Sequence, residues 1–146
     1  MRNANGREVG PIKAAAMSFR VALDSGCLRL ARLAAFPHGS CGDTCELLGQ
    51  FLIDSGLGEW RFSAGVRNHS LATHAWLEQD GLILDITADQ FPEIDEPVLL
   101  TRDRVWHDQF SLIERHRTAN LEYLLLLDSP ADAEWTYHEL CRRAGQ

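Results

Sequence analysis

The hydrophobic and polar positions of the chain change period twice, which separates helical ends from a central block of strands. Apolar residues recur at helical spacing near both ends, whereas they alternate with polar residues from Trp60 onward. The pattern predicts helices over 11–24, 28–35, from Cys41 to a stop at Ser55-Gly56, 120–128 and 131–144, and strands over 60–64, 73–78, 82–87 and 97–101. Residues 66–70 are predicted as a loop, and segment 105–107 stays ambiguous between strand and loop.

The clearest strand signal is a hairpin whose turn is Asp80-Gly81, a dipeptide typical of two-residue turns. In this register Glu78 pairs with Ile83 and Trp76 pairs with Asp85. One face of the hairpin is then apolar, with Ala75, Leu77, Leu84 and Ile86, and the other carries His74, Trp76, Glu78, Asp85 and Thr87. His74 and Asp85 become diagonal neighbours, roughly 7–8 Å apart at the backbone and within reach of an imidazole–carboxylate hydrogen bond.

Cys41 lies at the start of a predicted helix. Ser40 is a favourable N-cap residue, and Asp43, three residues later, is a shortened version of the capping-box acid. The unpaired N–H groups and the dipole of a helix N-terminus favour negative charge, so a thiol at this position ionises more easily. Because the thiolate is the reactive form, Cys41 is the candidate nucleophile.

A helix-start cysteine, followed by a histidine and an aspartate on adjacent strands, is the arrangement that thiol acyl chemistry needs. His74 would take the thiol proton and later protonate the leaving group, and Asp85 would fix the tautomer of the imidazole. Backbone N–H groups of the first helical turn, with that of Gly42 among them, point to where an oxyanion forms. Gln90 is a second oxyanion or substrate-binding candidate, and Trp76 would shield the His–Asp pair, line the cleft or only pack.

Three segments, in this order, resemble the motifs of the transglutaminase-like branch of the papain-like cysteine protease superfamily. They are Gly39-Ser40-Cys41-Gly42-Asp43, Thr73-His74-Ala75-Trp76-Leu77-Glu78 and Leu84-Asp85-Ile86-Thr87, within 36–91. The resemblance is to a small bacterial type. It implies an α+β fold in which a catalytic helix packs on an antiparallel sheet, with extra helices at both ends. It also implies Cys41 as nucleophile, His74 as base and Asp85 as orienting acid.

The chain departs from larger members of that branch, because it has no recognisable calcium loop and no glutamine just before Cys41. The site residues favour a cysteine hydrolase that acts on an amide bond, as a peptidase or a deamidase, through a thioester. The first alternative is an acyltransferase or transglutaminase, in which an amine replaces water. The second is a non-catalytic protein-interaction module, against which the intact Cys, His and Asp argue. We expect a protein or peptide substrate and no cofactor.

The cysteines have two other possible roles, as metal ligands and, for Cys45, as a second reactive thiol. Cys45, one turn after Cys41, is expected to be a core residue, with a resolving thiol as the alternative. A zinc site made of Cys41, Cys45, His74 and Asp85 is disfavoured, because Cys-x3-Cys lacks a second tight pair of ligands. The sequence therefore predicts no metal site.

Some polar residues downstream have ordinary interpretations. Asp89 is an alternative to Asp85 as the orienting acid, but it lies beyond the end of the hairpin. His107 and His116 have no partner that the pattern identifies. The charged run over 114–117 is most simply a solvated face.

Length and charge limit the number of domains and the kinds of partner. The 146 residues fit one domain over 11–146, with 1–10 as a mobile tail. The formal net charge of −7 argues against non-specific nucleic-acid binding. No apolar run approaches membrane-spanning length, and the N-terminus lacks the apolar region of a signal peptide. A bacterial-type cytoplasm is the expected location, with export by a signal-less route left open.

Overall fold

The computed structural model describes residues 9–127 and 129–145, without the side chains of Arg115 and His116. Within these residues the chain forms helices and one antiparallel five-stranded sheet, with strand order β4-β3-β2-β1-β5. The helices are α1 (Val9–Asp24), α2 (Cys41–Asp54), α3 (Glu122–Leu127) and α4 (Pro130–Arg143), and the strands are β1 (Arg61–Arg67), β2 (Thr73–Gln79), β3 (Leu82–Asp85), β4 (Leu99–Thr101) and β5 (Phe110–Thr118). The predicted α+β class is confirmed.

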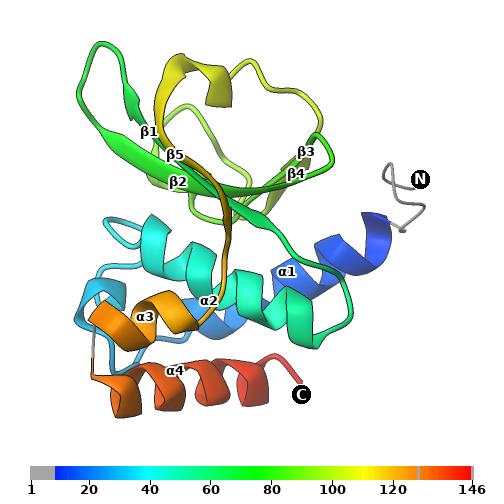
Figure 1. The fold of residues 1–146 in the computed structure, drawn as a ribbon, viewed down its shortest axis with the longest axis vertical. Coiled ribbons are helices and arrows are strands. Elements are labelled where there is room, and N and C mark those ends of the chain that lie inside the picture. Colours follow the sequence, from blue (N-terminus) through cyan, green and yellow to red (C-terminus); the bar gives the residue numbers. More distant parts are fainter. Residues whose placement is uncertain (1–8, 128, 146) are drawn as a thin grey trace.

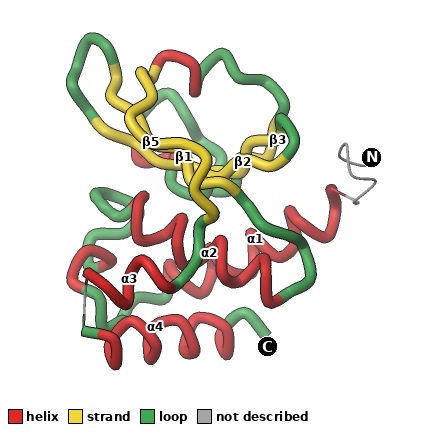
Figure 2. Tube along the Cα trace, in the orientation of Figure 1, coloured by secondary structure: helices red, strands yellow, loops and turns green. Residues whose placement is uncertain are grey.

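The elements form layers, with the helices on one side of the sheet and long loops on the other (Figure 1). Helix α2 packs directly on β1 and β2, and α4 packs on α1 and α3. On the opposite face, the segments that join β3, β4 and β5 have little regular structure and lie across the sheet (Figure 2). The sheet therefore separates a helical core from a layer of loops.

The Asp80-Gly81 hairpin forms in the predicted register. Both turn residues have positive φ, +51° at Asp80 and +78° at Gly81, as a primed two-residue turn requires. The ladder pairs Glu78 with Ile83 and stops at Leu77 and Leu84, one pair short of the predicted pair of Trp76 and Asp85. Strand β3 itself ends at Asp85, two residues before the predicted end. The apolar face packs into the main core, which contains Ala75, Leu77, Leu84 and Ile86. The other face carries a second, smaller cluster made of Trp76, Ile83, Phe91 and Phe110.

Three of the differences from the prediction concern the type of structure that a segment forms. Segment 28–35 forms only the 3₁₀ turn η1 (Ala31–Leu33), because it is too short to be a stable helix and ends before Pro37. Helix α1 begins at Val9, so the last two residues of the predicted tail are helical, while residues 1–8 lie outside the described part. Strand β1 continues through Val66 and Arg67, where a loop was predicted, because it pairs with strands on both sides.

Strand β5 is the element that the sequence pattern does not predict. It pairs with β1 and includes the run over 114–117, which was expected to be a solvated face. Arg117 instead reaches inward, where its Nη1 lies 2.7 Å from Oε2 of the buried Glu46 and its guanidinium covers the rings of Phe62 and Tyr123. A long arginine stem can cover apolar rings while its charge is paired, so its presence does not exclude a packed strand. The side chain of His116 is outside the described residues.

Helix α2 meets the segment after β5 through a glycine. A Cβ on Gly49 would lie 2.6 Å from the Cβ of Ala119 and closer still to the Ala119 carbonyl. The Ala119 backbone is held in place, since its N–H donates to the carbonyl of Trp60 at 2.8 Å. Only glycine at position 49 permits this approach of helix and backbone.

Arg20 ties α1 to the turn that follows β3. Its Nη1 and Nη2 each lie 2.9 Å from a carboxylate oxygen of Asp89, and Nη1 also donates to the carbonyls of Ile86 and Pro97 at 2.8 and 3.0 Å. The Arg20 side chain is 9% exposed, so its charge depends on these partners. Asp89, the alternative orienting acid, is therefore paired with an arginine and belongs to a structural clamp.

Arg20→Met should destabilise the protein by about 3 kcal/mol, because it leaves the Asp89 carboxylate and two carbonyls without their donor. Urea unfolding of the purified variant measures the loss. Arg142→Met is the matched control, since Arg142 pairs with Glu139 on the exposed side of α4 and is 70% exposed. The control should unfold like the wild type. Equal losses in the two variants would contradict the assigned role of Arg20.

Candidate active site

His74 and Asp85 meet as the hairpin register predicts. His74 Nε2 lies 2.6 Å from Asp85 Oδ2, and both side chains are fully buried. β2 supplies the imidazole and the last residue of β3 supplies the carboxylate. Because Nε2 is engaged by the carboxylate, Nδ1 is the ring nitrogen left for another partner.

Asp85 has further donors, one of which the sequence analysis missed. His107, in the 3₁₀ turn η3 (His107–Gln109), places its Nε2 2.7 Å from the same oxygen, Oδ2. The other oxygen, Oδ1, accepts the backbone N–H of Thr87 at 3.0 Å. The sequence pattern identifies no partner for His107, and the structure shows that it has one. This contact joins residues 22 positions apart through an irregular segment, so no periodicity in the sequence could reveal it.

The buried pair is held in its charged form. Burial opposes the charge of His74, but the charge of Asp85 and hydrogen bonds to Asp85 and Cys41 outweigh it and raise the His74 pKa to about 9. Burial also opposes ionisation of Asp85, yet the charge of His74 and hydrogen bonds from His107 and His74 lower the Asp85 pKa well below its ordinary value. An imidazolium and a carboxylate therefore coexist at neutral pH.

Cys41 stands at the first position of α2, half-buried and beside this imidazole. Its side chain acts on His74 through a hydrogen bond and through charge. Gln90, in the 3₁₀ turn η2 (Ala88–Gln90), places its Nε2 3.3 Å from His74 Nδ1 and donates to the Thr87 carbonyl at 3.0 Å. The fold thus brings Cys41, His74, Asp85 and Gln90 together from four separate elements.

The N-terminus of α2 begins where predicted, but the expected capping is wrong. The Ser40 hydroxyl donates to the Pro37 carbonyl at 3.2 Å and makes no capping bond. Asp43 accepts from Nε of Arg32 at 2.9 and 3.0 Å, so its carboxylate pairs with a tertiary partner. The amides of Cys41 and Gly42 precede the first intrahelical bond, from the Thr44 N–H to the Ser40 carbonyl. Their N–H groups receive no side-chain cap from Ser40, and they lie beside the thiol.

Trp76 is placed where it can shield the His–Asp pair but not bind a substrate. It is 1% exposed, and its Nε1 donates to Glu78 Oε1 at 3.2 Å. Its ring centroid lies 4.9 Å from that of His107 and 5.8 Å from that of His74. The indole N–H that an oxyanion would need is therefore already engaged.

More aromatic rings enclose His74 from the loop side of the sheet. The ring centroids of Phe91, Phe110 and Trp106 lie 5.2, 5.6 and 5.7 Å from that of the imidazole. Arg67 is linked to these rings through Glu93. Its guanidinium pairs with the Glu93 carboxylate, which also accepts the Trp106 indole N–H at 3.1 Å. A low-dielectric shell of this kind strengthens the electrostatic attraction within the His–Asp pair.

Cys45 lies in the main core and is 6% exposed. Burial, and after it the nearby Cys41, raises the pKa of its thiol well above the ordinary value. A thiol of this kind forms little thiolate, which a resolving role would require. The position of Cys45 agrees with the expected core residue.

Among the described residues, His74, Asp85 and His107 form a group of possible metal ligands, with ligand atoms within 4.8 Å of one another. The two Nε2–Oδ2 separations of 2.6 and 2.7 Å are hydrogen-bond lengths. Ligand atoms around tetrahedral zinc would be about 3.3 Å apart, given metal–nitrogen bonds of about 2 Å. The spacing fits a proton between each pair of atoms better than it fits a metal ion.

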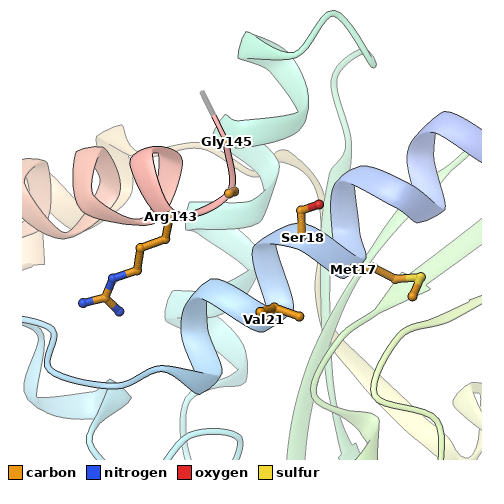
Figure 3. A pocket seen from close by; sticks show the side chains of 6 residues that line it. Met17, Ser18, Val21, Arg143 and Gly145 are labelled. Atoms are coloured by element: carbon orange, nitrogen blue, oxygen red, sulfur yellow. The ribbon is translucent and has the colours of Figure 1, made fainter.

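A pocket of about 350 Å³ lies elsewhere, between α1 and the C-terminal end of α4 (Figure 3). Its lining includes Met17, Val21 and Arg143. The Arg143 guanidinium is already paired, since it donates to the carbonyls of Ala22 and Gly26 at 3.1 and 2.7 Å. The lining contains no nucleophile next to a base, so this pocket offers no chemistry comparable to that around Cys41.

Comparison of the chain with protein-family models, with curated proteins and with solved structures finds no match. Among the described residues, no helix is both long and apolar enough to span a membrane. The function must therefore be argued from the site itself.

Proposed function

We propose that the protein is a cysteine enzyme that cleaves an amide bond, with Cys41 as nucleophile, His74 as acid and base, and Asp85 as the orienting carboxylate. The proposal includes a papain-like core of the transglutaminase type, with α2 as the catalytic helix. One observation carries it: a buried imidazole has one nitrogen on a carboxylate and the other available to a half-buried thiol at a helix start. This is the geometry of a thiol nucleophile and its base.

The reaction follows from the charges of these groups. The Cys41 thiolate attacks the carbonyl carbon, and the backbone N–H groups at the start of α2 stabilise the oxyanion. As the carbon–nitrogen bond breaks, the imidazolium gives its Nδ1 proton to the leaving amine or ammonia, which leaves a thioester on Cys41. His74 then takes a proton from water, the resulting hydroxide attacks the thioester, and the carboxylic acid and thiolate are released.

The second nucleophile decides the reaction type. Water gives a peptidase or deamidase, whereas an amine in its place would give acyl transfer. A non-catalytic binding module would not account for an imidazolium that remains charged while fully buried beside a thiol.

Alkylation by iodoacetamide, followed over pH by mass spectrometry, tests the proposal. At about pH 6, Cys41 should react at least about tenfold faster than an ordinary thiol, because thiols beside an imidazolium or at a helix N-terminus react as thiolates more readily than a free cysteine, whose pKa is about 8.5. Because the His74 pKa is about 9, this advantage should persist through neutral pH and end as the imidazolium loses its proton.

Substitutions show whether the fast labelling depends on the His74 base or only on an intact fold. His74→Gln keeps a donor for Asp85 but removes the base, and it should abolish the fast labelling. Cys45→Ser should leave the labelling unchanged. The exposed Cys27 is an internal reference in every sample. Labelling of Cys41 at the rate of Cys27, indifferent to His74→Gln, would overturn the enzymatic proposal.

A further inference from the structure

His107 makes a contact that neither packing nor the cysteine chemistry by itself requires. Its side chain is fully buried, and its Nε2 shares Asp85 Oδ2 with Nε2 of His74. The ring lies 4.8 Å from that of Trp106 and 4.9 Å from that of Trp76, measured between centroids. Asp85 thus lies between two imidazoles, one from β2 and one from η3.

We infer that His107 is a positioning residue, which fixes the Asp85 carboxylate so that Oδ2 stays on His74 Nε2 and the imidazole keeps Nδ1 toward Cys41. The catalytic consequence of this inference rests on the proposed function. The contact itself can be tested without that function.

The first argument is geometric. The terminal torsion of an aspartate is broad, so one bond at each oxygen restrains the carboxylate plane weakly. Thr87 holds Oδ1 at 3.0 Å, and His74 holds Oδ2 at 2.6 Å. His107 adds a second donor on Oδ2, from an element other than those that carry His74 and Asp85. The carboxylate then keeps its plane while the imidazole moves its proton.

The second argument comes from the other nitrogen of His107. Nδ1 is buried and has no hydrogen-bond partner among the residues that the structure describes. Burying an unpaired polar atom costs free energy, so a phenylalanine would fill the space between the tryptophans better if packing were the only role. The feature that distinguishes histidine from phenylalanine here is the Nε2–H donor to Asp85.

Two substitutions of His107 distinguish the effect of its Nε2–H donor from the effect of its ring volume. His107→Phe keeps the ring volume without the donor, and His107→Gln places an amide Nε2 near the position of the imidazole Nε2. We expect His107→Phe to slow Cys41 alkylation at about pH 6 by about tenfold, the loss typical of outer partners that orient an active group. His107→Gln should restore most of the rate. If His107→Phe labels like the wild type, or His107→Gln is as slow as His107→Phe, the inference is wrong.

Imidazole NMR tests the contact even if the alkylation shows no catalytic thiol. In ¹⁵N-labelled wild-type protein, His107 should carry its proton on Nε2 and a lone pair on Nδ1, and the His74 Nε2–H should resonate far downfield. That downfield proton should persist in His107→Gln and broaden in His107→Phe. A His107 protonated on Nδ1 alone in the wild type would overturn the inference. Loss of His74-dependent labelling with the NMR pattern intact would overturn only the proposed enzymatic function.

Discussion

Asp85→Asn should slow the acylation of Cys41 by a small activated ester by at least about 100-fold, given that the same change in a serine-protease triad costs about 10⁴. An asparagine offers one carbonyl oxygen and one NH₂ group, whereas the site presents two imidazole Nε2–H donors to one carboxylate oxygen. The imidazole of His74 would then be driven to the tautomer that carries its proton on Nδ1. That nitrogen could no longer accept the thiol proton. Mass spectrometry of the acylated protein over time measures the rate.

Asp89→Asn is the matched control for this experiment. Asp89 lies four residues further on, but its carboxylate binds the Arg20 guanidinium and not an imidazole. Loss of the Asp89 carboxylate should lower the free energy of unfolding, whereas the acylation rate of the folded protein should change little. Equal effects of the two substitutions on the rate would contradict the assignment of Asp85 as orienting acid.

Gly49→Ala is expected to cause the largest loss of stability, more than about 3 kcal/mol, beyond the usual cost of overpacking a core. The added methyl group would meet the backbone of Ala119, which is tethered to Trp60 by a hydrogen bond. Alanine would gain about 1 kcal/mol of helix propensity, which offsets only part of the strain. Urea unfolding monitored by tryptophan fluorescence measures the difference.

Gly10→Ala shows what the same substitution does without the clash. Gly10 lies in α1, and a Cβ at this position would meet none of the described residues within 4 Å. This variant should be as stable as the wild type or slightly more stable. If Gly49→Ala behaved like Gly10→Ala, the close contact between α2 and Ala119 would be wrong.

The sequence predicts best what local chemistry decides. The Asp80-Gly81 turn fixes the register of β2 and β3, and this register makes His74 a diagonal neighbour of Asp85. The start of α2 at Cys41 is also a local signal. The residues of the proposed triad therefore emerge from short segments whose order in the chain is known.

Contacts between distant segments explain what the sequence could not predict. His107 reaches Asp85 from an irregular turn, and β5 is recognisable as a strand only through its pairing with β1. Ser40 and Asp43 have the composition of a helix cap, yet Ser40 donates to the carbonyl of Pro37 in the preceding loop and Asp43 pairs with Arg32, eleven residues earlier. In these cases a contact outside the element itself prevails over the local preference of its residues.

The side chain of Ser40 points away from the helix that it precedes, and this has a cost. A serine that caps a helix contributes about 1 kcal/mol, and α2 forgoes that contribution at the end that carries Cys41. Proteins often keep such local defects where activity needs them, and under the proposed mechanism stability and reactivity oppose each other at this helix end. A substitution that gave α2 a well-formed cap would bond the N–H of Gly42 or Asp43, and at Gly42 it would compete with the proposed oxyanion. We therefore expect stabilising changes at the N-terminus of α2 to raise the stability of the protein and to lower the reactivity of Cys41.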